Sequence, residues 1–316
     1  MVRISFLVLC LGICFFGFSQ TVPLTTNLFF GNIKPNNQLP ERILNGRSML
    51  IFTPEITTKD LIQIQQQFAQ TGIDAVSVMP FHFLVGGHDV GETTLQTLKK
   101  REIHNLCFVR KKDGTYTLTL AAFSGNKKWI DATKVWQLSG SSLYELLLQL
   151  NREALNSYSK KNLLISESPD IQSELNIING SRVEAFTADL KVDRVAVRLS
   201  GRNEEDALLK EVCAMYPYKL EFVGDSLTDA QLRQKGFWYV LNAVSGSESM
   251  IKTLLGYVDK NPVEAKTQDV ATRYKFYLKK LEFDIFYLGK SWDASEYWPQ
   301  ALENYLRNIR KEFNIP

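Results

Sequence analysis

The sequence predicts an α/β protein made of two related βαβαβ units, each a mostly parallel or mixed sheet flanked by helices. Strand-like and helix-like segments alternate along the chain, the same order occurs twice, and each half is closed by a C-terminal amphipathic helix. Alternating strands and helices favour parallel pairing, because a crossover helix returns the chain to the same end of the sheet. We expect the last strand or hairpin of each unit to run antiparallel at the edge.

The first unit, residues 28–158, begins with an apolar strand and a capped helix. Thr57 precedes this helix, in which Leu61, Ile64 and Phe68 recur at helical spacing. Later segments alternate in the same way, and a helix capped by Ser142 closes the unit. The expected strands are 47–53, 73–79, 103–111 and 116–123, and the expected helices are 57–72, 90–102 and 141–155.

The second unit, residues 185–316, follows the same plan. Asn203 is placed to cap its first helix, and Thr228 with Gln231 three residues later predicts a capping box for the next. The expected strands are 193–200, 219–224, 237–244 and 274–281, and the expected helices are 203–216, 227–236 and 298–313.

Equal spacing indicates that the two units arose by duplication. Met49 lies 27 positions before Val76, and Val195 lies 27 positions before Phe222. The interval from the second strand to the third is 30 residues in the first unit and 18 in the second. The first unit therefore carries twelve additional residues, which fall around residues 80–92.

Two further segments belong to neither repeat. Residues 159–184 connect the units and contain one short apolar run, NLLIS at 162–166, which predicts a strand. Residues 246–269 form an insertion that we expect to loop out from the second unit.

The amino terminus has the pattern of a secretory signal peptide. Arg3 precedes an apolar run from Ile4 to Phe18, and a small-x-small site at Gly17 and Ser19 precedes Gln20. Residues 1–19 are therefore expected to be removed. We expect an exported bacterial protein that is periplasmic or extracellular, with outer-membrane association as an alternative. No later segment is long and apolar enough to predict a transmembrane helix.

Charge and cysteine content exclude several functional classes. The formal net charge is +3 and no run of five Lys or Arg occurs, so the sequence does not predict a nucleic-acid partner. After removal of the signal peptide the remaining cysteines are Cys107 and Cys213, which lie in different units. Both fall in apolar segments and are expected to be buried free thiols. No Cys or His cluster predicts a structural zinc site, and no cofactor is expected.

The loop PFHFLVGGHDVGE, residues 80–92, is the candidate functional site. It follows the second strand of the first unit, and ligands bind at such strand ends in parallel sheets. The second unit has an acidic residue, Asp225, at the matching place. The candidate ligand-binding residues are His82, Gly86, Gly87, His88, Asp89 and Asp225.

Two interpretations of this loop remain open. In the first, His82, His88 and Asp89 bind a metal ion, and Glu92 acts as the general base of a hydrolase. In the second, Asp89 is the N-cap of the following helix, Glu92 is the capping carboxylate three residues later, and the glycines form a turn. The second interpretation also makes FHFLV an extension of the preceding strand.

The segments DVGETTLQTLKKREIHNLCFV and DSLTDAQLRQKGFWYVLNAV each combine an acidic turn, a short helix and an apolar strand. In this they resemble the small α/β domains of exported bacterial envelope proteins, namely the TolB amino-terminal domain and the curli-secretion lipoprotein type. The resemblance covers about 60 residues per unit. It implies an envelope-associated role in binding or assembly.

We therefore expect a non-enzymatic, exported protein that binds an envelope protein or a small ligand. This expectation depends on the lack of a recognisable catalytic motif in the sequence. The alternatives are the metal-assisted hydrolase and a subunit of an envelope secretion or assembly complex. The oligomeric state is left open.

Overall fold

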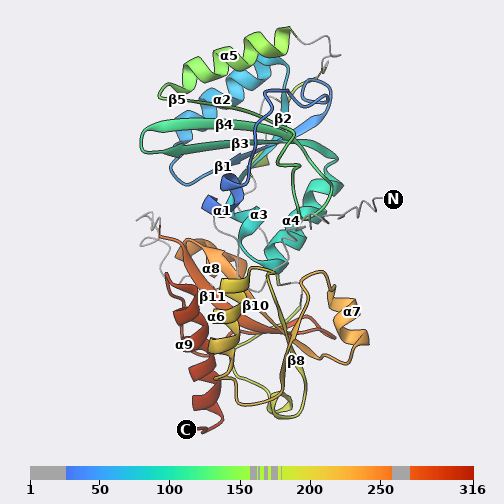
Figure 1. Cartoon of the computed structure of the whole chain (residues 1–316), viewed down its shortest axis with the longest axis vertical. Coiled ribbons are helices and arrows are strands. Elements are labelled where there is room, and N and C mark those ends of the chain that lie inside the picture. Colours follow the sequence, from blue (N-terminus) through green and yellow to red (C-terminus); the bar gives the residue numbers. More distant parts are fainter. Residues whose placement is uncertain are drawn as a thin grey trace, which may run out of the picture.

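The structure is a computed structural model that describes residues 26–156, 162, 164–166, 170–171, 177–178, 180–257 and 271–316. It confirms the predicted α/β class. Two sheets lie one above the other in Figure 1, with the short helices α3 (His82–Val85) and α4 (His88–Lys100) between them. The predicted signal peptide, residues 1–19, lies outside the described residues.

The first sheet is mixed, as predicted, with strand order β5-β4-β3-β1-β2-β6. Strands β1, β2, β3 and β6 are joined by parallel pairs, and the β3–β4 and β4–β5 pairs are antiparallel. The antiparallel edge therefore lies where the sequence predicted it. The strands are β1 (Arg47–Phe52), β2 (Asp74–Pro80), β3 (Ile103–Lys112), β4 (Thr115–Ala122), β5 (Val135–Gly140) and β6 (Asp170–Ile171).

The second sheet has the order β7-β12-β11-β10-β8-β9. Its last five strands follow the same order as β5-β4-β3-β1-β2 of the first sheet, which agrees with a duplication. The duplication itself stays a prediction. The strands are β7 (Arg182–Val183), β8 (Val195–Arg198), β9 (Leu220–Val223), β10 (Tyr239–Gly246), β11 (Arg273–Lys280) and β12 (Ile285–Tyr287).

One face of each sheet is covered by two helices of its own unit. In the first unit these are α2 (Thr58–Thr71) and α5 (Leu143–Leu155), which share a buried cluster containing Phe68, Leu147 and Trp136. In the second unit they are α6 (Asn203–Cys213) and α9 (Trp298–Glu312). In Figure 1, α2 and α5 lie above the first sheet, and α6 and α9 lie at the left of the second sheet.

The predicted N-caps are confirmed at three helices, and the capping box predicted for Thr228 and Gln231 is confirmed too. Thr57 and Asp60 cap each other's backbone at the start of α2. Thr228 and Gln231 do the same at α7 (Asp229–Gln234), which lies on the other face of the second sheet. Ser142 also caps α5 through the backbone nitrogen of Glu145. These local patterns fold as the sequence predicted because a capping box needs only neighbouring residues.

Two local predictions are wrong. FHFLV does not extend β2, because residues 82–85 form the helix α3. Asn203 is not the N-cap of α6 but its first helical residue. The Asp206 carboxylate instead accepts hydrogen bonds from the backbone nitrogens of Ser200, at 2.7 Å, and Gly201, at 2.9 Å. A side chain one turn into the helix thus holds the loop that precedes it.

The predicted connection contributes an edge strand to each sheet, namely β6 to the first and β7 to the second. The strand predicted over residues 162–166 falls partly outside the described residues, and the part that is described is not a strand. The prediction that residues 246–269 loop out is wrong for their described part, because they contain helix α8 (Glu248–Leu254), whose Ile251 and Leu254 are buried. Residues 258–269 lie outside the described part.

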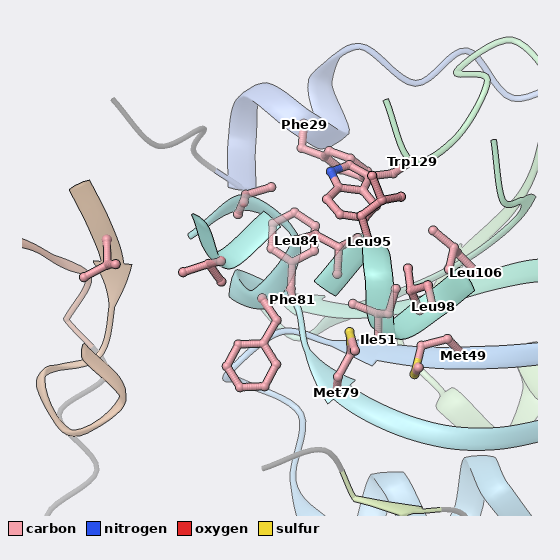
Figure 2. Close-up of a cluster of buried hydrophobic side chains, with 14 of the residues drawn as sticks. Phe29, Met49, Ile51, Met79, Phe81, Leu84, Leu95, Leu98, Leu106 and Trp129 are labelled. Atoms are coloured by element: carbon pink, nitrogen blue, oxygen red, sulfur yellow. The ribbon is translucent and has the colours of Figure 1, made fainter. Parts of the chain in front are cut away.

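A single hydrophobic cluster contains residues from both units. In the first unit it joins helix α1 (Thr26–Gly31), α3 and α4 to the sheet, through residues such as Phe29, Phe81 and Leu98 (Figure 2). From the second unit the same cluster includes Val244, Tyr277, Phe286 and Leu288, together with the apolar side of α8. The inner face of the second sheet is therefore covered partly by the first unit.

Both predicted free thiols are confirmed, since Cys107 and Cys213 are buried and unbridged. In the part of the chain that the structure describes, no helix combines the length and the apolar character needed to cross a membrane.

Candidate functional site at the joint between the units

The loop at residues 80–92 forms the joint between the two units. The backbone oxygen of Gly86 accepts a hydrogen bond of 2.9 Å from the backbone nitrogen of Ser245 in β10. Gly87 has a φ of 127°, and a Cβ at this position would lie 2.0 Å from the backbone oxygen of Ala243. Only glycine allows the chain to approach β10 so closely. The twelve additional residues of the first unit thus fall in the loop that contacts the second unit.

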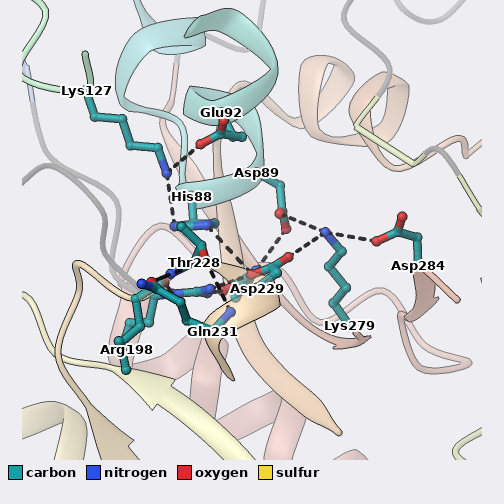
Figure 3. Close-up of polar contacts among 12 residues, drawn as sticks. His88, Asp89, Glu92, Lys127, Arg198, Thr228, Asp229, Gln231, Lys279 and Asp284 are labelled. Carbon is teal, nitrogen blue, oxygen red and sulfur yellow. Dashed lines mark hydrogen bonds and ion pairs between the residues drawn. The ribbon is translucent and has the colours of Figure 1, made fainter. Parts of the chain in front are cut away.

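The side chain of Asp89, in the first turn of α4, accepts hydrogen bonds from three residues of the second unit, of which Figure 3 labels Lys279. One carboxylate oxygen, Oδ2, accepts hydrogen bonds from the Tyr277 hydroxyl at 2.5 Å and from Nδ2 of Asn242 at 2.9 Å. The other, Oδ1, accepts from Nζ of Lys279 at 3.3 Å. Asp89 is only 6% exposed, and Asn242 and Tyr277 are fully buried. This is a charged contact inside the joint.

A second carboxylate, Asp229 at the start of α7, extends this network. It accepts a hydrogen bond from Nζ of Lys279 at 2.9 Å and from Nη2 of Arg198 at 2.5 Å. Arg198 is completely buried and also donates to Oδ1 of Asn242 at 3.2 Å. Lys279 reaches a third carboxylate, Asp284, at 3.2 Å. Lys279 is therefore shared among carboxylates of both units, whereas Arg198 pairs with Asp229 of its own unit.

His88 is buried beside this network, and its imidazole is uncharged near neutral pH. Its Nε2 is 4.0 Å from Oδ1 of Asp229, and its Nδ1 is 3.5 Å from Nζ of Lys127. Burial, together with the nearby cations Arg198 and Lys127, lowers the pKa of His88 to about 3. Lys127 in turn pairs with Glu92 at 3.0 Å.

The charged groups of the joint each have a partner of opposite charge. Burial alone raises the pKa of the Asp89 carboxyl, but the Lys279 ammonium and the hydrogen bonds from Tyr277 and Asn242 outweigh it, so the pKa lies well below its usual range. At Asp229 the Lys279 and Arg198 charges likewise outweigh burial and the Asp89 charge, and its pKa is lowered. Burial lowers the pKa of Lys279, but Asp89 and Asp229 outweigh it, so the net shift is upward. All three groups are therefore charged near neutral pH.

The proposed metal ligands do not form a ligand set. Among the described residues, no group of three or more His, Cys, Asp or Glu side chains is arranged to hold a metal ion. His82 is half-buried in α3 with its ring edge-on to Phe83, and the loss of solvent around the ring lowers its pKa to about 4. Glu92 contacts Lys127 and Gln96.

The capping interpretation of the loop is also wrong. The N-cap of α4 is Gly87, which has no side chain for capping, and Asp89 is already within the helix. Its carboxylate points into the second unit instead of toward the first turn of its own helix. An Asp followed three residues later by Glu is typical of a helix start, but the tertiary contacts of Asp89 use the side chain differently.

Asp225, the last predicted site residue, is half-buried between β9 and α7, and burial raises its pKa. Asp229, four residues later, enters the network in its place. Sequence reasoning also missed the buried polar residues of the second sheet: Arg198, Asn242, Tyr277 and Lys279. One signal was available, because Arg198 and Asn242 interrupt otherwise apolar strands and a buried polar side chain requires a partner.

Comparison of the chain with protein-family models, with curated proteins and with solved structures finds no match.

Proposed function

We propose that this chain is an exported, non-enzymatic protein whose two α/β units form one scaffold for binding an envelope protein or a small ligand. One observation carries the proposal. In an α/β enzyme the substrate would lie at the carboxyl ends of the parallel strands. At the carboxyl ends of β8 and β9, that place is occupied by His88 and Asp89 of the first unit. His88 and Asp89, the residues that most resemble an acid–base pair, therefore contact side chains of the second unit across the joint.

Two surface hollows support a binding role. One, of about 600 Å³, lies at the amino ends of β1 and β2. It is lined by Arg47, Asp74, Val76, Lys100, Arg101, Leu164, Ile165 and Ser166. The other, of about 400 Å³, lies beside α7 and includes Trp238, which is 42% exposed. Exposed aromatic side chains are enriched in protein interfaces.

The metal content of the purified mature chain, residues 20–316, tests the non-enzymatic part. We expect well below one metal ion per chain and a thermal midpoint that a chelator leaves unchanged. About one zinc, manganese or iron per chain, lost in His88→Ala and retained in His104→Ala, would overturn the proposal in favour of a metal-assisted hydrolase. His104 is a suitable control because it is a histidine outside the loop.

Cross-linking to an envelope extract tests the binding part. We expect a specific protein to cross-link to the wild-type chain and to be lost in Trp238→Ala, with Tyr144→Ala as a control that removes an aromatic side chain exposed to a similar extent. The same yield in both variants would place the partner elsewhere and contradict the use of the Trp238 surface.

A further inference from the structure

We propose that the second sheet carries a carboxylate-binding site, formed by Asn242, Tyr277 and Lys279, which the Asp89 side chain of the first unit occupies as an internal ligand. This inference goes beyond the proposed function and does not depend on it. The ligand class is a carboxylate on a short side chain or small molecule.

The donors match a carboxylate group by group. Tyr277 and Asn242 both donate to Oδ2 of Asp89, and Lys279 donates to Oδ1. An ionised carboxylate is a pure acceptor, so three converging donors select it over an amide or an ammonium group. The positive charge of Lys279 adds preference for an anion.

The site is built on strands, which hold its donors in place. Asn242 in β10 pairs directly with Tyr277 in β11, and Lys279 lies two residues further along β11 on the same face. Arg198, on the neighbouring strand β8, donates to Oδ1 of Asn242 and so turns the amide nitrogen toward Asp89. The donor geometry therefore comes from the second unit and from no part of α4.

Burial makes the site selective. Arg198, Asn242 and Tyr277 are fully buried, and the side chain of Lys279 is 13% exposed. Hydrogen bonds to a charged group are stronger in such surroundings than in water. In the native chain Asp89 is held beside these donors at a high effective concentration, which excludes free carboxylates. A test must therefore remove the internal ligand.

The test is chemical rescue of the Asp89→Ala variant of residues 20–316. This substitution removes the carboxylate and leaves the three donors, and formate is a carboxylate small enough to replace it. We expect sodium formate to raise the thermal midpoint of the variant in a saturable way, while sodium chloride at equal ionic strength does not. The wild-type chain should show no formate-specific rise, because Asp89 fills its site.

A second substitution checks the site itself. In the double variant Asp89→Ala/Asn242→Ala, we expect the apparent affinity for formate to fall about ten-fold or more, because one donor is lost. An equal formate-specific rise in the wild type or in the double variant would overturn the proposal. So would the absence of a rise in Asp89→Ala.

If Asp89→Ala does not fold in chloride, the same comparison applies to recovery of the native circular dichroism spectrum in formate. Asp89→Ser, which keeps a polar group at this position, then provides the second variant. Recovery in formate and not in chloride supports the site, whereas failure of both variants in formate contradicts it. Neither outcome bears on the metal content that tests the proposed function.

Discussion

The amide nitrogen of Asn242 donates a hydrogen bond of 2.9 Å to the carboxylate of Asp89, which lies 153 positions earlier in the chain. Both side chains are buried, and they belong to different units. The contact joins the first turn of α4 to the middle of β10, beside a hydrophobic cluster that also spans the units. It makes the loop at residues 80–92 a structural joint, and its loss is expected to affect stability.

Substitution of Asp89 by Asn is expected to destabilise the protein by about 1.5–3 kcal/mol, because it removes the charged acceptor of the buried Tyr277 and Asn242 donors and one of the three carboxylate partners of Lys279. Urea unfolding measures this change. Glu92→Gln is the matched control on the same helix, since the Glu92 side chain is 45% exposed in its pair with Lys127. Its cost should stay below about 1 kcal/mol, and equal losses in the two variants would contradict a buried charge at the joint.

Stability is expected to decrease as the pH falls below about 6.5. The pKa of His88 is about 3 in the folded chain, against an ordinary value of 6.5, so the unfolded chain takes up a proton first. The stabilisation from neutral His88 is thus complete above pH 6.5 and is lost as the pH falls toward 3, by about 1.4 kcal/mol per pH unit. His82, with a pKa of about 4, adds a similar loss over a narrower range.

Urea unfolding of the wild type and of His88→Gln, at several pH values between about 7.5 and about 5, measures this dependence. The slope of His88→Gln should be smaller than that of the wild type but not zero, because His82 and His104, whose pKa values are also lowered, remain. An unchanged slope would show that His88 is as accessible to protons in the folded chain as in the unfolded chain.

Gly87→Ala is expected to cost clearly more than Gly114→Ala. Both glycines have positive φ, 127° and 77°, so both substitutions introduce backbone strain. The strain is larger at Gly87, because its ψ of 176° places it in a region that is essentially confined to glycine. At Gly114 nothing lies within 4 Å of the added Cβ, whereas at Gly87 the backbone oxygen of Ala243 is 2.0 Å away. Urea unfolding of both variants measures the difference, and equal costs would contradict a close approach of the loop to β10.

At the start of α6, Asp206→Ala is expected to destabilise by about 1–3 kcal/mol, because the buried Asp206 carboxylate accepts the backbone hydrogen bonds of Ser200 and Gly201. Asn203→Ala, which removes the residue expected from the sequence to be the cap, should cost less than about 0.5 kcal/mol. Thermal or urea unfolding of the two variants compares them. A larger loss for Asn203→Ala would restore the capping role predicted from the sequence.

The two thiols are expected to resist modification in the folded protein. Burial raises the pKa of Cys107 and of Cys213 to about 12, and a thiol reagent attacks the thiolate. Mass spectrometry after a thiol reagent should therefore find no label in native buffer and two labels in denaturant. Rapid labelling of Cys213 alone in native buffer would indicate that α6 opens independently of the first unit.

Much of the fold could be predicted from the sequence because it depends on local patterns. The strand at Arg47–Phe52 and the helix at Thr58–Thr71 follow from apolar periodicity and a Thr cap, which involve neighbouring residues. The prediction for residues 82–85, which form α3, was wrong because so short and largely apolar a run fits a strand or a helix equally well. The elements α1 and β5 were not predicted at all. Packing against distant residues decides such short segments.

The loop at residues 80–92 was predicted to be the functional site, and its position between the two units was not predicted. A His, an Asp and two glycines after a strand are compatible with a metal site, a helix cap or a loop that contacts another unit. The sequence contains no information on which distant residues face them. Asn242 and Lys279, the partners that decide the question, lie more than 150 residues away.

By itself, the sequence determined the α/β class, most elements, the mixed character of the sheets and the burial of both thiols. These depend on apolar periodicity and on caps, which act within a few residues. Only the tertiary structure decided that His88 and Asp89 join the two units. A buried carboxylate requires donors and a compensating charge, and here those donors come from strands of the other unit that folding brings together.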